Sequence, residues 1–221
     1  PLEVVVRAYI TGVTDTSLWK KYSDGERVIY GIKFPEGLTK NQKLKKPLIT
    51  PTTRATGPGG HDEPITAAEI IKKKLVSEKT WRQIEKIALR LFQRGTHICE
   101  KAGFILADTK YEFGLDKGGK ITLIDEIHTP DSSRLWLKKS YKERFRKGQE
   151  VESYDKEIMR LWFVKQGYRG YGRAPQMPTE VVANIAQRYI QVFEKITAEK
   201  FEIDLSISPK ARIQDALSKL I

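Results

Sequence analysis

The pattern of hydrophobic and polar positions predicts strands first. Leu2–Arg7 is rich in valine, which is typical of a β-strand. Leu18–Tyr22 and the alternating segment Arg27–Phe34 flank the turn residues Ser23-Asp24-Gly25-Glu26. Two such segments around a turn indicate an antiparallel hairpin. The stretch 35–64 is rich in Pro, Gly and Thr, and it is long enough for a loop to carry function.

Helical periodicity begins after Pro64. Thr66 and Glu69 have the spacing of a capping box, which predicts a short helix to about Val76. The other predicted helices are Glu78–Ala102, stopped by Gly103, and then Asp155–Gln166, Thr179–Thr197 and Pro209–Ile221. This order of elements predicts an α+β fold, with a mainly antiparallel sheet backed by helices.

Three ionisable residues share one face of a strand predicted over Phe104–Gly114. Asp108, Lys110 and Glu112 are two residues apart, and the pleat of a strand points such positions to the same side. Charges that alternate with apolar residues are also typical of the solvated face of a half-buried sheet. The pattern alone leaves both interpretations open, a functional surface and a solvated one.

The return strand adds a fourth ionisable residue. After a glycine-containing turn, we expect the chain to run back along Ile121–Ile127. A register that places Glu112 opposite Leu123 or Asp125 puts Asp125 on the face of Glu112. Two converging carboxylates suit Mg²⁺, which keeps waters and takes further ligands from phosphates. Lys110 beside them could neutralise a transferring phosphoryl group.

The loop after this hairpin favours the functional interpretation. Thr129-Pro130-Asp131-Ser132-Ser133-Arg134 combines a proline-fixed turn, an acid, two hydroxyls and an arginine. Arginine offers a planar fork to a carboxylate or a phosphate. We therefore interpret Arg134 as a substrate clamp.

Composition and charge narrow the class of protein. The 221 residues are 39% hydrophobic, and 40 Lys and Arg against 28 Asp and Glu give a net charge of +12. This is the composition of a globular chain of one large domain or two small ones, with an affinity for anions. The one cysteine, Cys99, excludes an internal disulfide and a zinc site with the scattered histidines. Trp81, Met159 and Trp162 are expected to be packing residues, as is Cys99.

Targeting signals are not evident in the sequence. No apolar run approaches the roughly 20 residues that span a bilayer, and the first ten residues lack the order of a signal peptide. We expect a soluble, cytoplasmic protein without a membrane or nucleic-acid partner.

Taken together, these motifs resemble the SAICAR synthetase (phosphoribosylaminoimidazole-succinocarboxamide synthase) family. The resemblance covers most of the chain and rests on the segments Pro1–Arg7, Pro51–Thr53, His61-Asp62, Asp108–Gly114, Asp125-Glu126 and Thr129–Arg134. It implies a SAICAR synthase-like fold and an ATP- and Mg²⁺-dependent ligase of purine biosynthesis. Such a ligase joins the carboxylate of carboxyaminoimidazole ribonucleotide (CAIR) to the amine of L-aspartate. The products are SAICAR, ADP and phosphate.

The resemblance also implies roles for individual residues. Glu112 and Asp125 are expected to bind Mg²⁺ and the nucleotide, and Lys110 to contact substrate or the transferring phosphoryl group. Asp108 is expected to orient Lys110. The residues expected to bind substrate are Arg7, Ser17, His61, Asp62, Asp131, Ser132, Arg134 and Arg146, with the three arginines contacting the anionic groups of CAIR or aspartate.

Two departures from the family pattern shape further expectations. A serine usually follows the glycine equivalent to Gly12, so Thr16 or Ser17 is expected to supply the phosphate-binding hydroxyl. Members begin with a small antiparallel lobe that covers the nucleotide. We expect residues 1–50 to be the remainder of that lobe and 51–221 to be the central and C-terminal substrate- and ATP-binding domain. We also expect the sheet partners of Leu2–Arg7 to be at least partly missing, and the chain alone to bind ATP weakly and to couple ATP hydrolysis poorly to SAICAR formation.

Two other functions stay open on the residues. Tyr168-Arg169-Gly170-Tyr171-Gly172-Arg173 alternates aromatic and basic residues, as in a nucleic-acid-binding module. A small-molecule phosphotransferase would keep the metal-binding hairpin without aspartate as a substrate. The sequence is also compatible with a homo-oligomer.

Overall fold

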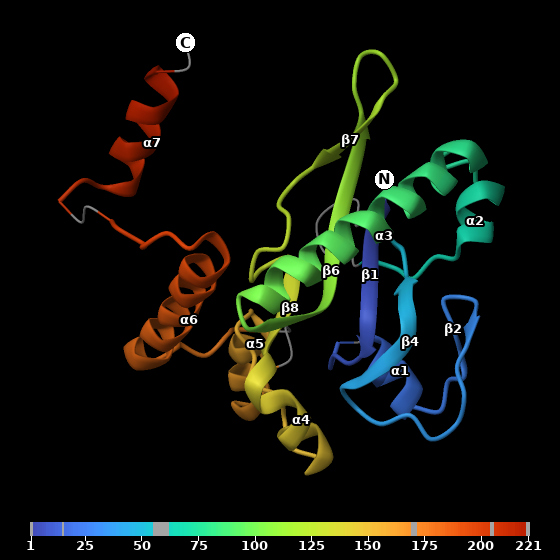
Figure 1. Cartoon of the computed structure of the whole chain (residues 1–221), viewed down its shortest axis with the longest axis horizontal. Coiled ribbons are helices and arrows are strands. Elements are labelled where there is room, and N and C mark those ends of the chain that lie inside the picture. Colours follow the sequence, from blue (N-terminus) through green and yellow to red (C-terminus); the bar gives the residue numbers. More distant parts are fainter. Residues whose placement is uncertain (1, 15, 55–61, 169–171, 204–205, 220–221) are drawn as a thin grey trace.

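A computed structural model describes residues 2–14, 16–54, 62–168, 172–203 and 206–219, and it shows an antiparallel sheet crossed by a long helix (Figure 1). The strands are β1 (Leu2–Ile10), β2 (Val28–Ile29), β3 (Ile32–Lys33), β4 (Gln42–Ile49), β5 (Thr52–Thr53), β6 (Phe104–Leu115), β7 (Ile121–Ile124) and β8 (Ser133–Leu137). The helices are α1 (Leu18–Ser23), α2 (Ala67–Lys72), α3 (Glu78–Lys101), α4 (Lys138–Arg146), α5 (Glu157–Lys165), α6 (Thr179–Thr197) and α7 (Pro209–Ser218). The α+β expectation is confirmed.

β6 is the organising strand of the six-stranded sheet. The sheet runs in the order β4-β1-β6-β7, while β8 also pairs with β6 and β5 with β1. Asp108 and Thr109 pair with β1 on one side and with β8 on the other. Leu2–Arg7, whose partners were expected to be partly missing, has sheet partners within this chain, because β1 pairs with β4, β5 and β6. Strands from 1–50 and from 51–221 therefore belong to one sheet.

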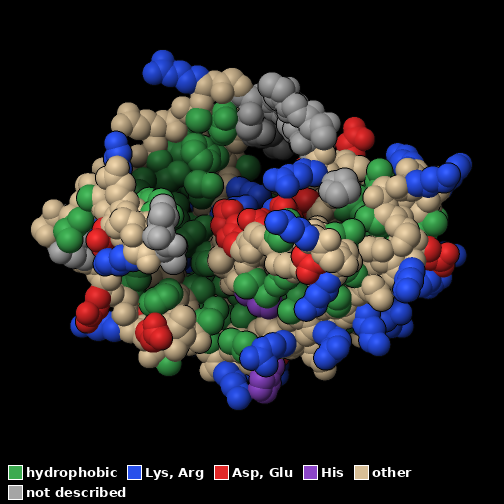
Figure 2. Space-filling model, turned by 90° about the horizontal axis from the view of Figure 1, so that it is seen from above, with side chains coloured by type: hydrophobic (Ala, Val, Ile, Leu, Met, Phe, Trp, Pro, Cys, Tyr) green, Lys and Arg blue, Asp and Glu red, His purple; other side chains and the backbone are tan. Residues whose placement is uncertain are grey.

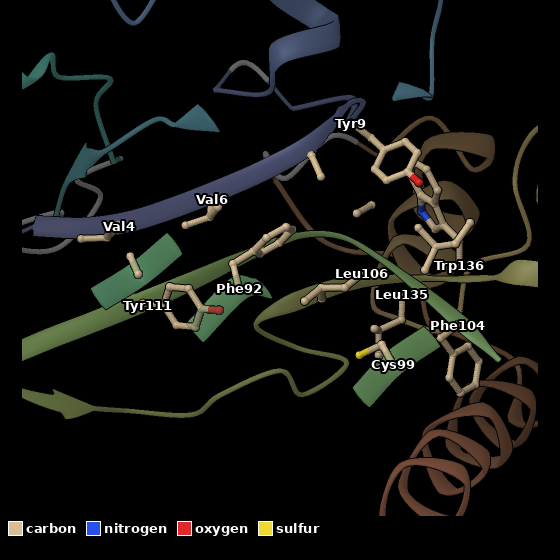
Figure 3. Close-up of a cluster of buried hydrophobic side chains, with 14 of the residues drawn as sticks. Val4, Val6, Tyr9, Phe92, Cys99, Phe104, Leu106, Tyr111, Leu135 and Trp136 are labelled. Carbon is tan, nitrogen blue, oxygen red and sulfur yellow. The ribbon is translucent and has the colours of Figure 1, made fainter. Parts of the chain in front are cut away.

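The main core lies between this sheet and α3. The helix places one stripe of residues against the strands, with Trp81 and Cys99 each 1% exposed. Figure 3 shows Phe92 beside Tyr111 and Leu106, with Val4 and Val6 on the adjacent strand. α3 begins after the cap Ser77 and ends at Lys101, before Gly103 with φ +84°. These bounds confirm the prediction for this helix.

The first predicted hairpin is wrong. Leu18–Ser23 is helix α1, because Leu18 and Tyr22 are one turn apart and both are buried in a second, smaller core. The hydroxyl of Tyr22 donates to the carbonyl of Pro35 at 2.8 Å, which fixes the helix against the following loop. The hairpin in this region is the short β2–β3 pair inside the segment expected to be one strand.

Other differences concern short elements. The Thr66 capping box is confirmed, but α2 ends at Lys72 rather than near Val76, and Lys74 has φ +53°. The stretch 35–64 contains β4 and β5, and β8 begins at Ser133, within the segment Thr129–Arg134 that was expected to be a loop. Trp162 and Met159, expected to be packing residues, are both half-buried. Within the described ranges, no helix is sufficiently long and apolar to cross a membrane.

Candidate functional site

Three neighbouring strands direct charged side chains to the sheet face opposite α3. On β6, Asp108, Lys110 and Glu112 alternate with residues that face the core, as the spacing predicted. Arg7 on β1 and Arg134 on β8 are the residues paired with Asp108. Residues directly opposite each other in an antiparallel pair share a face. Segments distant in sequence thus meet at one carboxylate.

Asp108 forms a buried ion-pair network with both arginines. Its Oδ2 lies 2.8 Å from a terminal nitrogen of Arg134 and 3.4 Å from one of Arg7. The Nε of Arg7 also donates to Thr50 Oγ1 at 2.7 Å. Burial opposes the charge of Arg134, but nearby carboxylates, led by that of Asp108, outweigh it and raise its pKa. Asp108 therefore contacts Arg7 and Arg134, and no contact between Asp108 and Lys110 is seen in the described part of the chain.

Lys110 instead lies among three other carboxylates. Its Nζ is 2.7 Å from Glu112, 3.2 Å from Glu3 and 3.4 Å from Asp125. Burial alone would lower the pKa of Lys110, but Glu112 and Glu3 raise it overall. The ammonium group is therefore held charged, next to an open face of the sheet.

Asp125 reaches this cluster by a different route from the one predicted. Glu112 pairs with Ile124, so the expected register with Leu123 or Asp125 is wrong. Asp125 follows the end of β7 with φ +64°, a left-handed conformation that Asp tolerates better than most residues. This turn brings Asp125 back to Lys110. A backbone hydrogen bond from Glu126 and the ammonium of Lys110 lower the pKa of Asp125.

The carboxylates around Lys110 are hard oxygen donors. Among the described residues, no group of three or more His, Cys, Asp or Glu side chains is placed to hold a metal on its own. Mg²⁺ is commonly bound by one or two carboxylates, with waters and substrate phosphates as its other ligands. Glu112 and Asp125 fit that donor set, because both lie within 3.4 Å of the same cationic atom.

The loop between Asp125 and Arg134 is held by internal hydrogen bonds. Ser132 and Thr129 exchange backbone-to-hydroxyl bonds of 3.2 Å, and the hydroxyl of Ser133 lies 2.8 Å from that of Thr109 on β6. The ring of His128 is anchored on the other side of the sheet, with Nε2 2.6 Å from the hydroxyl of Tyr111. Burial lowers the pKa of His128 to about 4, so this ring is neutral at pH 7.

A cavity of about 250 Å³ opens over this face. In the view of Figure 2, acidic and basic side chains gather beside a central hollow. The predicted site residues that line the cavity are Arg7, Asp62, Asp108, Lys110, Asp131, Ser132 and Arg134. Glu112 and Asp125 adjoin it through Lys110.

The remaining predicted site residues lie elsewhere. Ser17 is buried, and its hydroxyl donates to the carbonyl of Thr14 at 2.6 Å, whereas Thr16 lines the cavity. Arg146 is exposed at the end of α4 and is not among the lining residues. His61 falls outside the described residues.

The cavity is also lined by three residues that were not predicted as site residues, namely Asp155 and Lys156 just before α5 and Arg160 on α5. Asp155 accepts hydrogen bonds from the backbone of Leu135 and of Glu157, both at 2.8 Å. Its burial raises its pKa to about 7 despite these bonds and nearby Arg134. The spacing of four between Lys156 and Arg160 was the available signal, but nothing local indicated that α5 borders β8.

Comparisons with known proteins identify the family of this chain. Residues 1–177 match a family model described as SAICAR synthetase. A phosphoribosylaminoimidazole-succinocarboxamide synthase of Legionella pneumophila is 50% identical over 211 residues, which cover 95% of this chain and 66% of the relative. A chloroplastic one of Arabidopsis thaliana is 46% identical over 99% of this chain and 52% of its own length. The chain thus spans less than two thirds of these relatives.

Two solved structures resemble the fold. The SAICAR synthase of Saccharomyces cerevisiae complexed with SAICAR matches 92% of this chain and 62% of its own, with a TM-score of 0.72 and 35% identity. A SAICAR synthetase in complex with ADP matches 92% of this chain and 65% of its own, with a TM-score of 0.62 and 28% identity.

Proposed function

The chain belongs to the SAICAR synthetase family, and from that premise we propose that it acts as an ATP-dependent ligase of purine biosynthesis. It joins the carboxylate of CAIR to the amine of L-aspartate and forms SAICAR, ADP and phosphate. Related structures were solved with SAICAR and with ADP, which are two of these products.

One observation carries the proposal. Three cations, Arg7, Arg134 and Lys110, line the floor of the cavity. Each of them is held in place by an ion pair with a buried carboxylate. Fixed cations facing a cavity attract anionic ligands and hold them in a defined orientation. CAIR, ATP and aspartate are all anionic, so the electrostatics of the floor match the reactants.

The residues divide into two groups along this floor. Arg7 and Arg134, braced by Asp108, bind anionic groups of CAIR, while Thr16, Asp131 and Ser132 contact substrate at the rim. Glu112 and Asp125 would hold Mg²⁺, which would neutralise phosphate charge on the nucleotide. Lys110, which lies between these carboxylates, would contact the transferring phosphoryl group.

The chemistry requires that a carboxylate be activated before an amine can attack it. The γ-phosphoryl group of ATP passes to a carboxylate oxygen of CAIR, and ADP leaves. The amine of aspartate then attacks the acyl carbon, phosphate leaves with the carbon–oxygen bond electrons, and the nitrogen loses a proton. In this account Lys110 stabilises charge on the phosphoryl group, and Arg134 keeps the acyl group in line with the amine.

Aspartate dependence distinguishes this ligase from a small-molecule phosphotransferase. The protein is incubated with ATP, Mg²⁺ and CAIR, with and without aspartate, and ADP release is followed. We expect ADP release to require aspartate and to match SAICAR formation. Equal ADP release without aspartate would favour the phosphotransferase. The result depends on the ratio of ADP release with aspartate to ADP release without it, so a slow absolute rate does not affect it.

The nucleic-acid-binding alternative has no comparable support. Its motif, Tyr168–Arg173, includes residues 169–171, which fall outside the described part of the chain.

A further inference from the structure

Tyr30 has a strained backbone conformation in the turn between β2 and β3. Tyr30 and Gly31 are the two central residues of this hairpin, since Ile29 pairs with Ile32. Both have positive φ, of 54° and 72°, which is the combination of a type I′ turn. The first position of that turn favours Asn, Asp or Gly, and a bulky side chain is unusual there. A strained residue of this kind persists only where other contacts hold it in place.

The hydroxyl of Tyr30 makes such a contact outside its own hairpin. It donates to the backbone carbonyl of Thr16 at 2.9 Å, and Thr16 lines the cavity. A terminal nitrogen of Arg7 donates to the same carbonyl at 3.5 Å, which is long for a hydrogen bond. Burial raises the pKa of Tyr30, while the nearby charge of Arg7 opposes that rise. Tyr30 and Arg7 therefore meet at one carbonyl oxygen at the edge of the cavity.

The loop that carries Thr16 also lies against the second arginine of the floor. Gly12, with φ +98°, has no room for a side chain, because a Cβ there would lie 2.5 Å from the Cβ of Ser17 and 3.0 Å from a terminal nitrogen of Arg134. Ser17 donates its hydroxyl and its backbone N–H to the carbonyl of Thr14, at 2.6 and 2.9 Å. The loop thus contacts both arginines and, through Thr16, the β2–β3 hairpin.

The hydrogen bonds of Arg7 show what the Tyr30 hydroxyl contributes. The Nε of Arg7 donates to Thr50 at 2.7 Å, and one terminal nitrogen lies 3.4 Å from Asp108. The other terminal nitrogen makes the 3.5 Å contact with Thr16. Because Tyr30 supplies the shorter bond to that carbonyl, this nitrogen of Arg7 is available to an anionic ligand.

We propose that Tyr30 is a positioning residue for the substrate CAIR. Its hydroxyl holds the carbonyl of Thr16, so that the side chain of Thr16 and a terminal N–H of Arg7 bind the same anionic group. Donors that are fixed before binding lose less freedom when the ligand arrives, and they therefore bind it more tightly. The proposal rests on the proposed ligase function and adds to it a residue that is not among those lining the cavity.

The test removes one hydroxyl and keeps the ring. In Tyr30→Phe the ring can still pack against the smaller core. Tyr22→Phe is the matched control, because the Tyr22 hydroxyl also donates to a backbone carbonyl, that of Pro35 at 2.8 Å, and Tyr22 belongs to the same core without lining the cavity. Binding of CAIR is measured by calorimetry without ATP. The KM values for CAIR, ATP and aspartate, kcat and the melting temperature are measured for each protein.

We expect Tyr30→Phe to raise the Kd and the KM for CAIR about 3- to 10-fold, as for the loss of one hydrogen bond. The kcat and the KM values for ATP and aspartate should stay within about twofold, because Tyr30 does not touch the reacting atoms. Tyr22→Phe should lower the melting temperature at least as much, since the Tyr22 hydroxyl also accepts a bond from the backbone of Leu38. It should leave the Kd for CAIR unchanged.

Failure of this inference is separable from failure of the ligase proposal. Aspartate-dependent turnover with an unchanged Kd and KM for CAIR in Tyr30→Phe overturns the positioning role and leaves the ligase intact. A Kd for CAIR that rises equally in both variants also overturns it, as does an equal rise in the KM for ATP, because each would show a general loss of structure. Weaker CAIR binding in Tyr30→Phe alone, without turnover in the wild type, supports the positioning role and contradicts the ligase. A wild-type protein that does not bind CAIR contradicts both.

Discussion

The two faces of β6 are buried to similar extents with opposite kinds of side chain. Toward α3, Tyr111 is 0% exposed and packs among apolar residues, while toward the cavity Asp108 and Glu112 are 4% and 7% exposed. Burial of a charge is costly unless it is paired. The cavity face meets that condition because Asp108 pairs with two arginines and Glu112 with Lys110.

One strand can therefore support stability on one face and chemistry on the other. The core face gains stability from apolar contacts that do not depend on direction. The charged face gains little stability from its pairs, but it fixes the direction of each charge before substrate binds. Mutations on the two faces should therefore separate stability from activity.

The largest expected effect is on the core face. Phe92→Ala removes a ring that is 2% exposed, and truncations of this kind cost about 3–5 kcal/mol. We expect denaturant titration to show that loss, with kcat per folded molecule within about twofold of the wild type. Leu89→Ala, at a 39% exposed position of the same helix, should cost much less. A folded Phe92→Ala protein with a collapsed kcat would show that the two faces are not separable.

Glu112→Gln should have the reverse outcome. It removes one charge and little volume from the proposed Mg²⁺ site, so we expect Mg²⁺-supported turnover to fall by about 100-fold or more, in the range known for electrostatic catalytic groups. Thermal stability should change little. Glu143→Gln, at an exposed position of α4, is the control. Unchanged Mg²⁺ dependence would remove Glu112 from the metal site.

His128 gives the core face a pH dependence. Its pKa is lowered to about 4 by burial, against about 6.5 when unfolded, so the unfolded state binds a proton first as the pH falls. Its contribution to stability is complete above pH 6.5 and is lost toward pH 4, by at most about 3 kcal/mol. The pKa of Asp155 is raised to about 7, so its contribution to stability has the opposite dependence and is lost as the pH rises toward 7.

The contribution of His128 is isolated by comparison with His128→Asn, because asparagine tolerates the positive φ of 54° at this position. The difference in unfolding free energy between the two proteins should shrink as the pH falls from 6.5 to 4. A constant difference across that range would show that His128 titrates normally.

Arg134→Lys keeps a positive charge on the cavity face but removes the planar fork. We expect kcat/KM to fall about 10- to 50-fold, as for the loss of a charge-assisted hydrogen bond. Arg82→Lys, on the exposed side of α3, should leave kcat/KM unchanged. Wild-type KM values for both CAIR and aspartate in Arg134→Lys would contradict the proposal that Arg134 binds an anionic group of the substrate.

The smallest expected effect is at the contact between α3 and the site loop. A Cβ on Gly95 would lie 2.2 Å from the ring of His128, so this glycine makes room for the histidine. Gly95→Ala gains about 1 kcal/mol of helix propensity but forces the ring to move, and we expect a net loss of about 1–2 kcal/mol by thermal denaturation. Arg94→Ala is the control, and a Gly95→Ala protein more stable than the wild type would contradict the contact.

The sequence predicted correctly which residues share a face of β6, but it did not predict which residues they contact. The two-residue period of a strand placed Asp108, Lys110 and Glu112 on one face, because this period depends only on the local backbone. The partners of these residues depend on register and on segments far along the chain. Asp125 reaches Lys110 through a left-handed turn, and no period in the sequence encodes such a turn.

Short elements were difficult to predict for a related reason. The five residues of β8 follow a loop directly, and their role as a strand depends on pairing with β6. Leu18–Tyr22 is too short for its hydrophobic period to distinguish a helix from a strand. Its helical conformation depends on the tertiary packing of Leu18 and Tyr22. The longer helices α3 and α6 were predicted correctly because each repeats its apolar stripe over several turns.

We propose that the charged face of β6 activates a carboxylate for attack by an amine. The most direct test uses CAIR labelled with ¹⁸O in its carboxylate, together with ATP, Mg²⁺ and aspartate, and analyses the released phosphate by mass spectrometry. Transfer through an acyl phosphate moves one labelled oxygen into each phosphate as SAICAR forms, which is the result we expect. Phosphate without the label would rule out an acyl phosphate of CAIR as the intermediate.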